Sequence, residues 1–263
     1  METEIKKSSF KTTFIVLISI VLAFAIYYSI MSMLSPRRKL EQIKSEFIGK
    51  ASEKDESEQQ ILTDSTYLKL LKEKAFLQSR LAMAQTDSIY LSINLEDSTI
   101  NLEISGVVVH KVKINSFQIS KILSGSDYSI LSMLSTPFII SSSIVTIKKE
   151  PVMLKMAPKD TSEYKPDIMP DTSIAEPVNY ILELNHGIRI YVYQADKTKF
   201  VDKMSQFKFD LKERLNDIWS SLKSISVLKV PEYHPFIRIK LLRTDAKIIY
   251  RAIPKNGQIA VLT

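Results

Sequence analysis

An uninterrupted apolar run near the amino terminus constrains this chain more than any other feature. Residues Phe14 to Leu34 include no charged side chain and no proline. At about 1.5 Å of rise per helical residue, such a run spans a hydrocarbon core of roughly 30 Å. It is long for the apolar core of a cleaved signal peptide, and no small-x-small cleavage site comes after it. The sequence therefore predicts a short basic tail over residues 1–13 and a single transmembrane helix over 14–34, through which the chain contacts the lipid bilayer.

Basic residues flank this span on both sides. Those nearest to it are Lys6, Lys7 and Lys11 before it and Arg37, Arg38, Lys39 and Lys44 after it. A literal count of these charges favours a cytoplasmic body. A short basic tail before a single span, however, resembles a signal anchor, which translocates the part of the chain after the span. We predict a single-pass protein of the inner (cytoplasmic) membrane with its carboxy-terminal domain in the periplasm.

Residues 35–86 have helical composition and predict a stalk or linker between the membrane and a globular domain. A highly charged stretch over 51–60 indicates a solvated break. Beyond it, apolar residues recur at three- and four-residue spacings, at Ile61, Leu62, Leu68, Leu71, Ala75, Leu81 and Ala82. This pattern is typical of an amphipathic helix. Two interpretations stay open: a coiled-coil stalk that self-associates, or a spacer that packs on the globular domain.

From Ser88 the period of the apolar residues changes to two, which predicts strands. Three segments, Tyr90 to Leu95, Thr99 to Ile104 and Val107 to Ile114, predict a meander. Residues 137–147 predict a further strand pair. A hairpin is expected over 179–193, with its turn at Asn185-His186-Gly187.

Two later segments stand out. Residues 150–177 are rich in proline and charge and too long for an ordinary loop, so they predict a functional flap or a mobile segment. Residues 197–225 predict an amphipathic helix. Its apolar stripe is Phe200, Met204, Phe207, Leu211, Leu215, Ile218 and Leu222. A stripe of this kind usually packs into a core, so we expect it to be buried.

Composition excludes several functional classes. The chain contains no cysteine and three histidines, which removes disulfides and thiolate catalysis and predicts no metal site. Zinc-ligand spacings, phosphate-binding glycine loops and nucleic-acid motifs are absent, so we expect no cofactor and no nucleic acid partner. The net charge of +7 suits an anionic lipid surface or an acidic polymer such as a cell wall.

The most informative motif is Tyr233-His234-Pro235-Phe236-Ile237-Arg238, followed by Asp245-Ala246-Lys247, by Ile253-Pro254 and by a final strand over 258–262. This order resembles the end of the L,D-transpeptidase (YkuD-like) catalytic domain. In that family a Ser-His-Gly-Cys-Ile-Arg motif enters a strand, an Asp-Ala-Lys helix start comes next, and a Val-Pro turn precedes the last strand. The resemblance extends weakly over residues 88–263.

The resemblance implies a mainly β (α+β) domain of the L,D-transpeptidase type, with the inserted helix over 197–225. His234 matches the motif histidine, and Arg238 matches the arginine thought to receive a substrate carboxylate. The family also has an upstream His-Gly, which is His186-Gly187 here. The implied degenerate binding cleft comprises His186, Gly187, Tyr233, His234, Phe236, Arg238 and Lys240.

Phe236 occupies the position of the family's catalytic cysteine, and Pro235 occupies that of the glycine before it. A phenyl ring cannot form an acyl-enzyme. The resemblance therefore implies the fold without the reaction, that is, a pseudoenzyme with no catalytic residue.

Simpler interpretations of the same residues stay open. His186 can be an ordinary hairpin residue and His234 can shape a turn before proline. In the strand over 236–241, alternation places Phe236, Arg238 and Lys240 on one face, which can be merely a solvated cationic surface.

Together these features predict a membrane-anchored, catalytically inactive L,D-transpeptidase-like protein. It would act as a cell-envelope module that binds a peptidoglycan peptide or a partner protein. Two alternatives stay open. One is a structural subunit of an envelope membrane complex. The other is an active transferase or hydrolase with an unorthodox nucleophile, such as Tyr233 or Ser226.

Overall fold

The computed structural model describes residues 2–48, 65–149, 177–196 and 200–263. The charged stretch over 51–60 and nearly all of the proline-rich segment over 150–177 lie outside these residues. The chain forms two compact units: residues 1–52 with 211–234, and residues 53–210 with 235–263.

The first unit contains a long helix, α1 (Glu2–Ile48), which continues past the predicted end of the span and includes Pro36. Its part from Phe14 to Phe47 includes a stretch that is apolar and long enough to cross a membrane, and it is the one such helix in the described part of the chain. Its apolar side chains over 14–34 are largely exposed. Beyond them, side chains four residues apart are buried on one face of the helix: Ser35, Lys39, Ile43 and Phe47.

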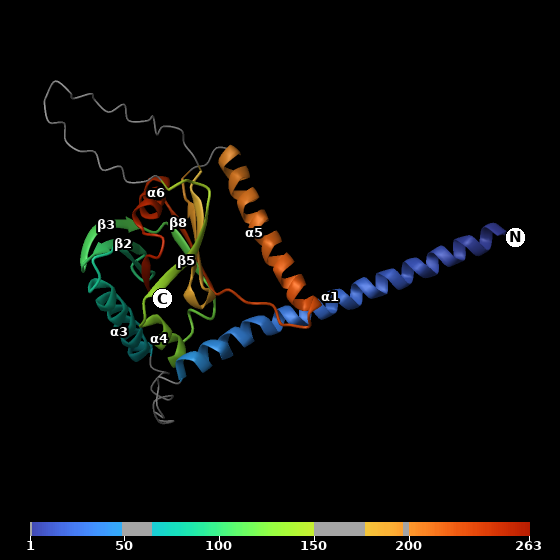
Figure 1. Ribbon diagram of the computed structural model, residues 1–263, viewed down its shortest axis with the longest axis horizontal. Coiled ribbons are helices and arrows are strands. Elements are labelled where there is room, and N and C mark those ends of the chain that lie inside the picture. The colour runs from blue at the N-terminus through green and yellow to red at the C-terminus, as the bar shows by residue number, and fades with distance from the viewer. Residues whose placement is uncertain (1, 49–64, 150–176, 197–199) are drawn as a thin grey trace, which may run out of the picture. The chain divides into compact units, whose positions relative to one another are not determined.

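Within the described residues, the second unit is built on a nine-stranded mixed sheet in the order β3-β2-β1-β9-β5-β6-β7-β8-β4 (Figure 1). The strands are β1 (Tyr90–Asn94), β2 (Thr99–Ile104), β3 (Val107–Lys113), β4 (Ser116–Ile119), β5 (Phe138–Val145), β6 (Asn179–Leu184), β7 (Arg189–Gln194), β8 (Phe236–Leu241) and β9 (Gln258–Leu262). The helices are α3 (Ser65–Ala84), α4 (Tyr128–Leu134), α5 (Phe200–Ser226) and α6 (Arg243–Ala252). Helix α5 runs from the second unit into the first. The chain is therefore an α+β protein, as predicted.

The predicted meander and hairpin are both present. Strands β1, β2 and β3 pair in antiparallel fashion, and Gly106 occupies the β2–β3 turn at a φ of +84° that suits glycine. Strands β6 and β7 pair around the short 3₁₀ turn η2 (Asn185–Gly187). Local periodicity and turn chemistry were sufficient to locate these elements.

The strand pair expected over 137–147 is wrong: β5 is a single strand with two neighbours. Phe138 and Ile139 pair with β9, whereas β5 from Ile140 onward pairs with β6. A bulge between Ile140 and Ser142 marks the change of partner. Strand β4, which the sequence did not predict, forms the edge of the sheet beside β8.

The expectation that the apolar stripe of α5 is buried is also wrong. The side chains of Met204, Phe207, Leu211, Leu215 and Ile218 are exposed, Phe207 to 60%. Polar side chains instead fix the amino-terminal half of the helix to the second unit. Periodicity identifies the helix and its apolar face, but it does not show what covers that face.

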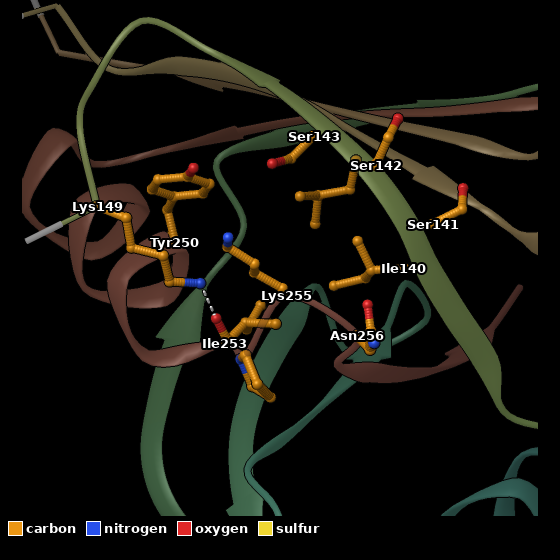
Figure 2. A pocket seen from close by; sticks show the side chains of 11 residues that line it. Ile140, Ser141, Ser142, Ser143, Lys149, Tyr250, Ile253, Lys255 and Asn256 are labelled. Atoms are coloured by element: carbon orange, nitrogen blue, oxygen red, sulfur yellow. Dashed lines mark hydrogen bonds between the residues drawn. The ribbon is translucent and has the colours of Figure 1, made fainter. Parts of the chain in front are cut away.

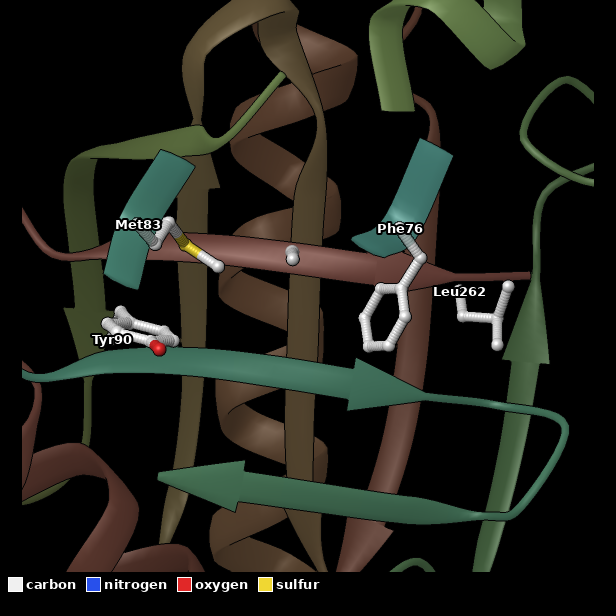
Figure 3. Close-up of a cluster of buried hydrophobic side chains, with 5 residues drawn as sticks. Phe76, Met83, Tyr90 and Leu262 are labelled. Carbon is white, nitrogen blue, oxygen red and sulfur yellow. The ribbon is translucent and has the colours of Figure 1, made fainter. Parts of the chain in front are cut away.

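Helix α3 packs on the globular domain. Phe76 and Met83 join Tyr90, Ala260 and Leu262 in a buried cluster between this helix, β1 and β9 (Figure 3). For residues 65–84 the structure thus agrees with the interpretation of a packed spacer. Leu70, Leu77 and Leu81 are exposed, and self-association of the stalk stays a prediction.

Tyr180 on β6 is a buried tyrosine whose hydroxyl lacks a hydrogen-bond partner in the described part of the chain. Its ring centroid lies 5.2 Å from that of Tyr250. An unpaired buried hydroxyl costs about 1–3 kcal/mol in desolvation. We therefore expect Tyr180→Phe to raise the free energy of unfolding by about 1 kcal/mol at neutral pH. Chemical denaturation of the full-length protein in detergent micelles measures this change.

The same variant has a signature in alkali. Burial raises the pKa of Tyr180 well above its ordinary value of 10. Its contribution to stability is complete below pH 10 and is lost as the pH rises above it, because only the unfolded chain then releases the proton. Above pH 10 the free energy of unfolding should therefore fall less steeply in Tyr180→Phe than in the wild-type protein, by about 1.4 kcal/mol per pH unit. Tyr193→Phe is the control at neutral pH, since it removes a hydroxyl that donates a hydrogen bond to Asp210; equal stabilisation by both variants at neutral pH would contradict the argument.

Candidate functional site

Strands β7 and β8 are parallel neighbours, and their register pairs Arg189 with Phe236 and Tyr191 with Arg238. The Arg189 N–H donates to the Pro235 carbonyl oxygen at 2.9 Å. The η2 turn with His186 and Gly187 leads into β7, and the Tyr233–Arg238 motif leads into β8. The structure therefore places Gly187 and Phe236 at the starts of adjacent strands. Tyr233 and His234 belong to the other unit, so the convergence of the two histidines stays a prediction.

Alternation along β8 is as expected: Ile237, Ile239 and Leu241 are buried, whereas Phe236, Arg238 and Lys240 are not. On this second face the Arg238 guanidinium packs against two rings. Its Cζ lies 4.6 Å from the ring centroid of Phe236 and 5.5 Å from that of Tyr191. These cation–π contacts fix the plane of the guanidinium.

We call Arg238, Phe236, Tyr191, Tyr193 and Gln118 the Arg238 cluster. Arg238 Nη1 donates a long hydrogen bond to Gln118 Oε1 on the neighbouring strand β4, with a donor–acceptor distance of 3.4 Å. Arg238 Nε is buried and has no hydrogen-bond partner in the described structure. No carboxylate among the described residues forms an ion pair with Arg238. Because a guanidinium presents its N–H groups as a fork that matches a carboxylate, this arginine is suited to bind one.

The amino-terminal half of helix α5 contacts the cluster at Tyr193. The Tyr193 hydroxyl donates to Asp210 Oδ1 at 2.7 Å, and Arg243 Nη2 donates to Asp202 Oδ2 at 2.9 Å. Burial, followed by the hydrogen bond to Asp210, raises the pKa of Tyr193, so its phenol remains neutral. These two bonds hold the amino-terminal half of α5 on the β7 side of the sheet.

A separate cavity of about 250 Å³ lies between β5, α6 and the turn before β9 (Figure 2). Lys149 Nζ donates to the Ile253 carbonyl oxygen and lies 5.3 Å from the Tyr250 ring centroid. Burial, and secondarily the charge of Lys255, lower the pKa of Lys149. The residues that line the cavity are Ile140, Ser141, Ser142, Ser143, Lys149, Leu182, Tyr250, Ile253, Pro254, Lys255 and Asn256.

None of the predicted cleft residues lines this cavity. Lys149 and Lys255 are far apart in sequence and lie in no recognisable motif, so sequence reasoning missed them. The same holds for Tyr191 and Gln118, which meet Arg238 only through strand pairing, and for Tyr193, whose ring centroid lies 6.4 Å from that of Tyr191. No hydrogen bond in the described structure joins Lys149 to a serine; its Nζ donates instead to the Ile253 carbonyl oxygen.

No group of three or more histidine and acidic side chains in the described ranges is arranged to hold a metal ion. Fold and site together define an α+β protein with a mixed sheet, an arginine–aromatic cluster and one helix able to span a membrane. Comparisons of the chain with protein-family models, with curated proteins and with solved structures found no match.

Proposed function

We propose that the chain is a membrane-anchored, non-catalytic envelope module of the L,D-transpeptidase type, which binds the carboxylate of a peptidoglycan stem peptide. The observation that carries the proposal is Arg238, whose guanidinium packs on two rings while its Nε lacks a partner among the described residues. Helix α1 supplies the anchor. The domain then lies on the periplasmic side of the inner membrane, where peptidoglycan is found.

Binding without catalysis agrees with the local chemistry. Phe236 stands where the family has its nucleophile, and its ring instead supports Arg238. Ser226, a candidate for an unorthodox nucleophile, donates its hydroxyl to the Lys223 carbonyl oxygen of its own helix at 2.8 Å. No base activates this serine in the contacts of the described residues.

Sedimentation of the full-length protein with purified sacculi tests the proposal. Loss of a charge-assisted hydrogen bond to a carboxylate costs about 1.5–3 kcal/mol. We therefore expect Arg238→Gln to lower the affinity for sacculi by roughly tenfold to a hundredfold. Lys111→Gln is the matched control, because it removes the same charge from an exposed position on β3 at the opposite edge of the sheet.

Equal losses in the two variants would mean that binding depends on net charge alone, and the site proposal would fail. No binding of the wild-type protein to sacculi, together with stoichiometric recovery of a protein from detergent extracts, would favour a protein partner instead.

A further inference from the structure

The first unit contains a basic cavity of about 500 Å³ that the proposed function does not use. Of the predicted cleft residues, Tyr233 lines it. One wall is the part of α1 beyond the apolar run, and the other is the end of α5 with the segment after it. The residues that line it are Ser35, Arg38, Lys39, Gln42, Ser224, Lys229, Val230, Pro231, Glu232 and Tyr233. Three of these side chains are cations and one is an anion, so the lining carries an excess of two positive charges.

The walls are joined by direct contacts. Ser35 Oγ donates to the Pro231 carbonyl oxygen at 2.6 Å. Lys39 is only 5% exposed, and its Nζ lies 3.9 Å from Glu232 Oε1. Glu232 is itself largely exposed, and this is the one ion pair of Lys39 in the described structure. A buried ammonium with so distant a partner is poorly compensated, and an anion in the cavity would supply the missing charge.

The position of the cavity along α1 places it at a membrane surface. Arg38 and Lys39 lie four and five positions after Leu34, the last residue of the apolar run. At about 1.5 Å per residue they lie roughly 6–8 Å beyond the hydrocarbon core. The headgroup layer of a bilayer extends over about the same depth.

Exposed apolar side chains border the cavity. Val227 and Leu228 directly precede Lys229, and Leu228 is 78% exposed. Leu228 is three residues from Pro231, which is bonded to Ser35, so at most about 10 Å of chain separates them. Trp219, also exposed, lies two turns earlier on α5. Apolar and aromatic side chains beside basic ones are typical of segments that lie at a bilayer surface.

We propose that this cavity binds the phosphodiester headgroup of an anionic phospholipid, with Val227 and Leu228 among the acyl chains. The inference rests on the membrane anchor of the proposed function. Lys39 and Arg38 would contact the phosphate, and Lys229 would lie at the edge of the cavity. A free phosphate presents the same anionic oxygens but cannot use the apolar border.

Calorimetric titration of the full-length protein in dodecyl maltoside micelles distinguishes the two sources. The probes are dihexanoyl phosphatidylglycerol, dihexanoyl phosphatidylcholine and inorganic phosphate. We expect phosphatidylglycerol to bind about tenfold or more tightly than the other two, since it alone satisfies both the cations and the apolar border. Lys39→Gln and Arg38→Gln should each lower this affinity by roughly tenfold.

Arg37→Gln is the matched control, because Arg37 neighbours Arg38 on the same helix but does not line the cavity and is 79% exposed. It should change the affinity by less than about twofold. Lys39→Arg keeps the charge and should retain binding, and equal melting temperatures exclude misfolding of the variants.

Equal binding of the two lipids, equal binding of inorganic phosphate and phosphatidylglycerol, or an equal loss in Arg37→Gln would each overturn the inference. Failure of the anchor itself has a different readout. If alkaline extraction released the protein from cell membranes, the membrane part of the proposed function would fail, whatever the titrations gave.

Discussion

Replacing Phe76 by alanine is expected to lower the free energy of unfolding by about 3–5 kcal/mol, the usual cost of removing a buried phenyl ring. Phe76 joins α3 to the sheet in the cluster with Met83, Tyr90 and Leu262 (Figure 3). These side chains come from three packed elements, of which β9 is distant in the chain from α3 and β1, so their atoms cannot all collapse into the space that the ring leaves. Denaturation of the full-length protein in detergent micelles, monitored by circular dichroism, measures the change.

Leu77→Ala provides the matched control, because Leu77 is the next residue on the same helix and is half exposed. It should change stability by no more than about 0.5 kcal/mol. If both variants unfolded at the same denaturant concentration, α3 would contribute nothing to the core, and the packed-spacer interpretation would be lost.

Arg80→Met is expected to cost about 3–5 kcal/mol, because it leaves the charge of Glu103 buried without its partner. Glu103 on β2 is fully buried. It accepts a hydrogen bond from Arg80 Nη2 at 3.0 Å and another from the Ser92 hydroxyl. Burial, and secondarily the charge of Glu103, raise the pKa of neighbouring Tyr90. The hydrogen bonds of Arg80 and Ser92 to Glu103 therefore join α3 to the meander, beside the apolar cluster.

Two further variants separate the ion pair from general effects of charge. Lys69 on α3 also pairs with an acid of the meander, Glu96, at 3.2 Å, but that pair is largely exposed. Lys69→Met should therefore cost at most about 1 kcal/mol. Adding Glu103→Leu to Arg80→Met should recover most of the lost stability, since no unpaired charge then remains. Similar losses in the Arg80 and Lys69 variants would show that burial of Glu103 is unimportant.

Much of the secondary structure could be predicted from local patterns. Alternation over Tyr90 to Ile114, the turn at Asn185 to Gly187 and the stripe along 200–222 each identified an element close to its observed bounds. Strand β4 was missed because its four residues carry too short a pattern. Strand β5 was divided in two because its bulge interrupts the alternation.

The candidate site shows where local patterns stop. Alternation in β8 placed Phe236 and Arg238 on one face, and burial agrees with this. It could not show that Tyr191 lies beside Arg238, because that depends on parallel pairing between β7 and β8 across the inserted helix. The two cavities likewise depend on contacts between distant segments. One combines Lys149 with Lys255 and the other Lys39 with Lys229, and neither pair belongs to a sequence motif.

The sequence by itself determined the apolar helix near the amino terminus, the strands with a clear period of two and the absence of a cysteine nucleophile. Each of these depends only on residue type and on spacing along one segment. Tertiary structure alone decided which faces are covered. Helix α5 presents its apolar stripe to the surroundings, whereas α3 buries Phe76 against β9. Burial depends on which distant segments meet, and no local spacing encodes that.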